Sequence, residues 1–188
     1  AAIQGRDCDG WNCLMYAVCN NHADVVKLLC KHGSGSGVLL MQSGNKGGTP
    51  LTLAAYHGFP GIAEYLCDVG GEELMFKTRN DGTNALSWAA GQGHLDIVRL
   101  LFERGGARML GRSHLGLTAL HVAASQARLQ VVRFLCEVGG DAYVSAQTNN
   151  GENAADKARA GGATAGYFAE KGKEGDREAT VRFLEERL

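Results

Sequence analysis

The chain has 188 residues, with 19 Lys plus Arg against 20 Asp plus Glu and a formal net charge of −1. This balance argues against a nucleic-acid binder and against a polybasic membrane anchor, because both need an excess of Lys and Arg near phosphates. A content of 45% hydrophobic and 21% charged residues is typical of an ordinary folded protein. No apolar run approaches the roughly 18 residues of a membrane-spanning helix, and the first ten residues lack the features of a signal peptide.

The chain repeats itself. Four stretches align without gaps, and each has glycine as its second residue; these origin glycines are Gly10, Gly47, Gly82 and Gly116. The intervals between them are 37, 35 and 34 residues, and a fifth origin, Gly151, follows 35 residues later. Leucine recurs four and nineteen residues after each of the first four origins, and alanine seven residues after. We therefore predict one domain of five units, at about 7–33, 44–70, 79–105, 113–139 and 148–188.

Each unit has the apolar spacing of two short helices. In unit one, Leu14 and Val18 are four residues apart, as are Val25 and Leu29. Neither helix is long enough to be stable alone, so neighbouring units must cover the apolar stripes by stacking. Small alanines in the first helix, opposite larger side chains in the second, predict a curved stack. The expected fold is an all-α solenoid with a concave inner surface.

Three segments resemble ankyrin repeats: GTPLTLAAYHG from Gly48, GHLDIVRLLFERGG from Gly93 and LTALHVAA from Leu117. The resemblance covers nearly the whole chain and is weaker in the first and fifth units. It implies an ankyrin-repeat solenoid of stacked helix-turn-helix units with β-hairpin-like finger connectors. It also implies that protein partners bind along the fingers and the inner helices.

The connectors depart from the ankyrin pattern. Every interval exceeds the usual period of about 33 residues, so we expect extended fingers. The segment VRFL at Val181 repeats VRFL at Val132 but stands fourteen residues farther from its origin glycine, which predicts an insertion at about 161–176. Two interpretations of the insertion stay open: a tolerated surface loop, or a partner-docking tip that carries Tyr167 and Phe168.

One set of residues has the composition of a catalytic triad, because Ser87, His121 and Asp156 each follow an origin glycine by five residues. Equivalent positions on packed helices lie about 8–10 Å apart, whereas a nucleophile and its base must approach to about 2.6–3.2 Å. We therefore predict no catalytic residue, no cofactor and no small-molecule substrate. The ankyrin resemblance implies instead that His121 forms a hydrogen bond with the backbone between units.

Three cysteines stand twenty residues after their origins, at a position that unit three fills with Phe102: Cys30, Cys67 and Cys136. A position shared with Phe predicts buried thiols in a reducing compartment, and hence an intracellular protein.

A second group of thiols crowds unit one together with two histidines: Cys8, Cys13, Cys19, His22 and His32. It contains neither the C-x-x-C nor the H-x-x-x-H spacing of common zinc sites. We interpret these residues as core and surface side chains and predict no metal site.

Three arginines recur every fourth residue after unit three: Arg104, Arg108 and Arg112. They fit either a site for an acidic or phosphorylated peptide or a solvated row of charges.

The ankyrin arrangement selects residues near each origin glycine as finger tips, and residues nine and ten after it as groove walls. The predicted partner-binding residues are Asp9, Trp11, Asn20, Lys46, Tyr56, His57, Asp81, Thr83, Gln92, Leu115, Leu117 and Gln126. We expect Trp88 to be packed between units. Trp11 is either an exposed interaction anchor or packed against the N-terminal segment near Ile3.

These features predict a non-enzymatic protein–protein interaction module, or a scaffold or assembly subunit, that binds proteins through finger tips and the concave groove. The alternative is a regulatory ankyrin domain of a longer enzyme or channel polypeptide that acts in cis.

Overall fold

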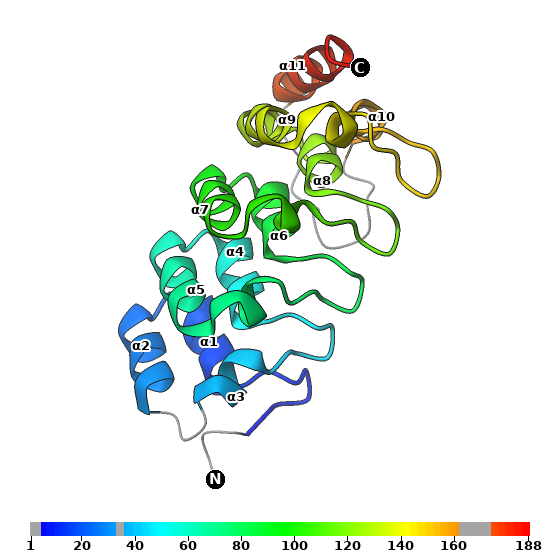
Figure 1. The fold of residues 1–188 in the computed structure, drawn as a ribbon. Helices are drawn as coiled ribbons and strands as arrows, with labels where there is room; N and C mark the ends of the chain where they lie inside the picture. The colour runs from blue at the N-terminus through cyan, green and yellow to red at the C-terminus, as the bar shows by residue number, and fades with distance from the viewer. Residues whose placement is uncertain (1–4, 33–35, 162–173) are drawn as a thin grey trace.

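The computed structural model describes residues 5–32, 36–161 and 174–188, which form a row of stacked helix pairs (Figure 1). The first helices of the five units are α1 (Cys13–Cys19), α4 (Pro50–His57), α6 (Ala85–Gln92), α8 (Ala119–Ser125) and α10 (Ala154–Ala160). The second helices are α2 (Ala23–His32), α5 (Pro60–Met75), α7 (Leu95–Gly105), α9 (Leu129–Val144) and α11 (Glu174–Glu185). The first helices form one layer and the second helices the other (Figure 1). The predicted all-α solenoid is therefore confirmed.

The residue two positions after each origin glycine directly precedes the first helix and caps it. These N-cap residues are Asn12, Thr49, Asn84, Thr118 and Asn153, and the side chain of each accepts a hydrogen bond from a backbone N–H in the first turn. Such caps satisfy amides that would otherwise lack a partner. The polar positions between glycine and leucine thus fix where each helix starts.

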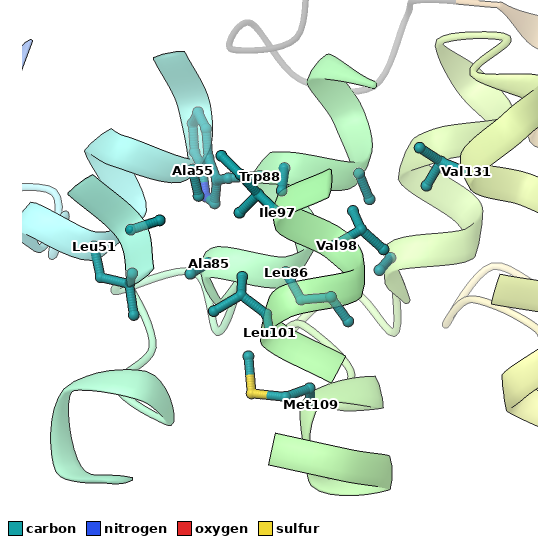
Figure 2. Close-up of a cluster of buried hydrophobic side chains, with 14 of the residues drawn as sticks. Leu51, Ala55, Ala85, Leu86, Trp88, Ile97, Val98, Leu101, Met109 and Val131 are labelled. Atoms are coloured by element: carbon teal, nitrogen blue, oxygen red, sulfur yellow. The ribbon is translucent and has the colours of Figure 1, made fainter. Parts of the chain in front are cut away.

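The leucines and alanines that recur in the repeat pattern form most of the core. The alanines seven residues after the first four origins, Ala17, Ala54, Ala89 and Ala123, are at most 5% exposed. Small side chains here let neighbouring first helices approach closely. Figure 2 shows Leu86 of α6 and Leu101 of α7 meeting in the core above Met109.

A third helical segment follows the second helix in units one to four, which corrects the expectation of extended fingers. It is α3 (Ser36–Met41) in unit one, the end of α5, the 3-10 helix η2 (Gly106–Leu110), and the end of α9. Leu74 of α5 and Met109 of η2 are 1% exposed, and Tyr143 of α9 is 9% exposed. The extra connector residues therefore fold back and enlarge the core.

Paired glycines make this fold-back possible. The sequences GGEELM, GGARML and GGDAYV place two apolar residues three and four positions after the second glycine. That second glycine has a positive φ, for example +58° at Gly106, which side chains disfavour. A Cβ on the first glycine would lie 2.5 Å from Met109 at Gly105 and 2.4 Å from Tyr143 at Gly139. One glycine thus permits the bend and the other permits close packing.

Two of the N-caps also bond to the third segment. The Asn12 side chain donates to the backbone oxygen of Leu39 at 3.0 Å, and Asn84 donates to the backbone oxygen of Met109 at 2.9 Å. In unit four the hydroxyl of Tyr143 accepts from the N–H of Leu120 instead, at 3.3 Å. Each such bond locks the short segment onto the first helix of its own unit.

The finger connectors end in tight turns, and the described residues contain no β-strand, so the β-hairpin detail is not confirmed. At each turn the origin glycine donates to the residue three positions earlier, as Gly82 does to Arg79 at 2.9 Å. Neighbouring turns are bonded side by side. Asn80 donates its side-chain amide to the Asn45 carbonyl at 2.9 Å, and Asn149 does the same to His114 at 2.9 Å.

The predicted insertion at 161–176 lies largely outside the described residues. The helix that follows it, α11, fills the place of a second helix: Leu184 is fully buried, and the Arg133 guanidinium lies 5.0 Å from the Phe183 ring centroid.

Candidate functional site

A groove of about 490 Å³ lies where the first three finger turns meet α4 and α6. We call it the aromatic groove. It is lined by Asp9, Trp11, Gly44, Asn45, Lys46, Gly48, Thr52, Leu53, Tyr56, His57, Arg79 and Trp88. Turns supply one wall and helix side chains the floor, so the shape of the groove depends on the stacking of units one to three.

Aromatic rings form its floor. The Tyr56 ring meets Trp88 edge to face, with centroids 5.4 Å apart, and meets His57 in the same manner at 5.0 Å. His57 in turn stacks on Phe59 at 5.7 Å. Because Tyr56 and His57 remain partly open to solvent while Trp88 is 6% exposed, the upper rings can contact a ligand and the buried ring holds them in place.

The Arg79 guanidinium packs against the same floor. The Arg79 guanidinium lies 4.4 Å from the centroid of the Trp88 ring, and its Nε donates to the backbone oxygen of Lys46 at 3.3 Å. Asp81 lies 3.9 Å from Arg79 within the same turn, the third finger. Arg79 thereby connects the second finger, the third finger and α6, and the cation–π geometry strengthens that connection.

Trp11 is packed on one side and open to the groove on the other. Its ring is half-buried, meets the Tyr16 ring edge to face at 5.5 Å, and lies so close to Gly44 that an added Cβ would be 3.0 Å from its Cδ1 atom. Its own chain therefore packs one side of the ring, while the ring also lines the groove. Ile3, the other proposed contact, lies outside the described residues.

The groove brings together some of the predicted partner-binding residues and not others. It contains Asp9, Trp11, Lys46, Tyr56 and His57, but not Asn20, Asp81, Thr83, Gln92, Leu115, Leu117 or Gln126.

For two of the residues outside the groove, the prediction of partner contact is wrong, because their side chains are buried: Thr83 is 8% and Gln126 is 1% exposed. Thr83 turns inward, accepting from Trp88 Nε1 at 3.0 Å and donating to Asp81 at 2.6 Å. Leu115 is 62% exposed on the fourth finger and stays a predicted contact.

Sequence reasoning missed Arg79 and treated Trp88 only as core. Arg79 stands three residues before an origin glycine, where units one, two, four and five have Asp7, Gly44, Ser113 and Thr148. Unit three has both an arginine at this position and a tryptophan six residues after its origin glycine, and this combination could have indicated the Arg79–Trp88 contact.

Two arginines of the row after unit three form ion pairs with the preceding unit, although Arg108 stays 67% exposed. Arg104 pairs with Asp68 and lies 3.5 Å from Glu64, and Arg108 lies 3.0 Å from Glu72. These carboxylates belong to unit two, so the arginines join neighbouring units.

The buried cysteines have unreactive thiols. Burial raises the pKa of Cys30, Cys67 and Cys136 to about 11, so each stays protonated near neutral pH. Within the described ranges, no group of three or more His, Cys, Asp or Glu is placed to hold a metal ion.

The family follows from a comparison with protein-family models. The model "Ankyrin repeats (3 copies)" matches residues 1–77, 35–111 and 71–148, which together span most of the chain. The chain belongs to the ankyrin-repeat family. A comparison with curated proteins finds no matching relative. Ankyrin repeats are generally protein–protein interaction modules and are typically non-enzymatic.

As in the ankyrin signature, His121 bonds between units. Its Nδ1 accepts from the Thr118 N–H at 3.3 Å, which leaves Nε2 to donate to the Glu152 carbonyl of unit five at 3.3 Å. Burial lowers the pKa of His121 and keeps the ring neutral. Ser87 and Asp156 likewise bond within the caps of their own helices, at Asn84 and Asn153. These three residues thus serve as hydrogen-bond partners of the helix N-caps.

In the part of this ankyrin-repeat chain that the structure describes, every helix is too short or too polar to cross a membrane.

Proposed function

We propose that the chain is a non-enzymatic protein-interaction module, a scaffold or assembly subunit, that holds a segment of a partner protein in the aromatic groove. The observation that supports this is the groove itself, which half-buried Trp11 and Tyr56 line together with Asp9 and Lys46. Trp and Tyr are enriched among interface hot spots, and polar residues form the rim of an interface.

The floor of the groove is preorganised. Arg79 and Trp88 fix Tyr56 before any partner arrives, so little side-chain entropy is lost on binding. A volume of about 490 Å³ suits a few side chains of an extended segment rather than a whole domain surface.

The test is site-specific capture followed by a binding measurement. A photo-crosslinking amino acid at His57, which is exposed in the groove, captures the occupant from a lysate of the source cells, and the purified partner is then titrated. The double variant Trp11→Ala with Tyr56→Ala should weaken binding by roughly 30-fold or more, the loss of one strong hot spot.

The matched control is Tyr65→Ala, a part-buried tyrosine on the second helix α5, away from the groove. It should leave the dissociation constant unchanged. Equal weakening by both variants, or equal capture from a crosslinker placed at exposed Glu73 of α5, would contradict binding in the groove.

A further inference from the structure

The charges of the aromatic groove indicate what kind of segment it holds, and this inference rests on the proposed function. Among the described residues, the charged side chains that line the groove are Asp9 of the first finger, Lys46 of the second and Arg79 of the third. They differ in how far the rest of the chain already engages them. That difference decides which charge a partner can satisfy.

The two cations are engaged within the chain. Arg79 is buried, its guanidinium lies 4.4 Å from the centroid of the Trp88 ring, and Asp81 lies 3.9 Å away from it. Lys46 also has an interaction inside the chain. An acidic segment would therefore have to compete with these internal contacts.

The histidine that lines the groove adds no charge near neutral pH. Burial, and then the charge of the nearby His94, lowers the pKa of His57, so a partner meets an uncharged ring there. His57 therefore does not attract an acidic segment.

The Asp9 carboxylate is different. It is exposed, and among the described residues it accepts no hydrogen bond and forms no ion pair. The neighbouring Asp7 carboxylate accepts from the N–H groups of Asp9 and Trp11, at 2.9 and 2.7 Å, and from the Tyr16 hydroxyl. Arg6, the cation of this turn, donates to backbone carbonyls instead. Asp7 thus holds the turn together, whereas the charge of Asp9 is available to a partner.

The first finger presents Asp9 and Trp11 from one firmly bonded turn. Besides the two bonds to Asp7, the Asp9 carbonyl accepts from the Asn45 N–H of the second finger at 2.8 Å. The Trp11 ring is packed on one side by Tyr16 and lines the groove. A carboxylate in the same turn as an open aromatic ring attracts a basic side chain, because the carboxylate pairs with the charge and the ring face binds it as well.

Unit three already contains such an arrangement. There the Arg79 guanidinium lies over the Trp88 ring and close to the Asp81 carboxylate, so a cation, a ring and a carboxylate of one unit are combined. Unit one has the ring of Trp11 and the carboxylate of Asp9, and no basic side chain of the described residues lies over that ring. A basic side chain of a partner would complete the same arrangement in unit one.

We propose that the occupant of the aromatic groove is an extended, basic segment of a partner protein, which places an arginine or lysine side chain over Trp11 with its charge at Asp9. The apolar stem of that side chain covers the ring, and its N–H groups donate to the carboxylate. This assigns the charge of the partner segment, which the proposed function leaves open.

The test is an NMR titration of the isotope-labelled full chain with N-acetyl-arginine amide. The chain has two tryptophans, and the buried Trp88 indole, which donates to Thr83, is the internal reference for the Trp11 indole signal. The arginine amide should bind at least about fivefold more tightly than N-acetyl-citrulline amide, which has nearly the same shape but no charge. Asp9→Asn should remove most of that difference. The matched control Glu73→Gln, at an exposed carboxylate of α5 outside the groove, should leave it unchanged.

Four results would overturn the proposal. They are equal binding of the two amides, tighter binding of N-acetyl-glutamate amide, no shift of the Trp11 signal at about 50 mM arginine amide, and an equal loss of affinity in Asp9→Asn and Glu73→Gln.

These failures differ from failure of the proposed function. A partner captured through the crosslinker at His57 by a segment without a basic side chain would keep the groove as the binding site and reject its basic occupant. Equal capture at His57 and Glu73 would contradict the groove itself.

Discussion

Tyr56 of α4 packs edge-on against Trp88 of α6, with ring centroids 5.4 Å apart and ring planes at 64°. The open floor of the aromatic groove therefore rests directly on the interface between units two and three. A partner that contacts Tyr56 therefore contacts a side chain that also belongs to the interface between units two and three.

This relationship separates binding from stability. Trp88→Ala should lower the free energy of unfolding by about 3–5 kcal/mol, because it leaves a cavity between the units. Tyr56→Ala should cost less than about 1.5 kcal/mol, since its ring is partly exposed, while removing most partner binding. Urea denaturation followed by circular dichroism measures the free energy of unfolding of both variants. A loss of helix on Tyr56→Ala would show that the ring belongs to the core.

The alanine layer gives a second prediction. Ala89 is fully buried between first helices, so Ala89→Glu places an uncompensated carboxylate in the core and should cost roughly 3–5 kcal/mol. Ala142→Glu, at an exposed position of α9, is the matched control and should shift stability by less than about 0.5 kcal/mol. Equal unfolding midpoints for the two variants would refute the assigned core.

The paired glycines give a third prediction. Gly106 has φ +58° and ψ −152°, a region that is essentially restricted to glycine, so Gly106→Ala should cost about 1–3 kcal/mol. Gly111 has φ −59° and no atom within 4 Å of an added Cβ. Gly111→Ala should therefore be neutral or slightly stabilising. Denaturant melts of the two alanine variants compare them, and a similar cost at both sites would contradict a conformational requirement at the bend.

Stability should fall in mildly acidic solution. Burial lowers the pKa of His121, and burial together with the nearby His94 charge lowers that of His57. The unfolded chain therefore takes up protons below about pH 6.5 while the folded chain resists them. The stabilisation is complete above that pH and decreases as the pH falls through it, by at most about 1.4 kcal/mol per pH unit for each group.

His121→Thr tests the contribution of His121. It copies the cap that Thr49 and Thr52 form in unit two and removes the titrating ring. Urea denaturation between about pH 7.5 and 5.5 should show a flatter dependence in the variant, despite the lost bond to Glu152. An unchanged slope would assign the pH dependence to other groups.

The sequence predicts the solenoid well because its signal is repeated. Leucine and alanine at fixed distances from each origin glycine are enough to place the helix pairs, and the structure buries all of them except Leu29, which is partly buried. The third helical segment was missed although GGEELM, GGARML and GGDAYV share one spacing, because a single turn of helix is too short to produce a periodic pattern.

The groove was only partly predictable. Position relative to the origin glycine is enough to select Tyr56 and Trp11, but not to tell inward from outward side chains at the turns. Thr83 was expected on the surface and instead bonds to Trp88, because the Asp81 carboxylate turns its hydroxyl inward. Such choices depend on three-dimensional neighbours from other units.

The bonds between finger turns have a consequence for how the chain folds. Those from Asn45, Asn80 and Asn149 each close a loop of only 35 or 37 residues. Contacts of such short range favour fast folding. Folding can therefore begin in whichever unit pair forms first and spread in both directions, and amide exchange should open the stack from its ends inward.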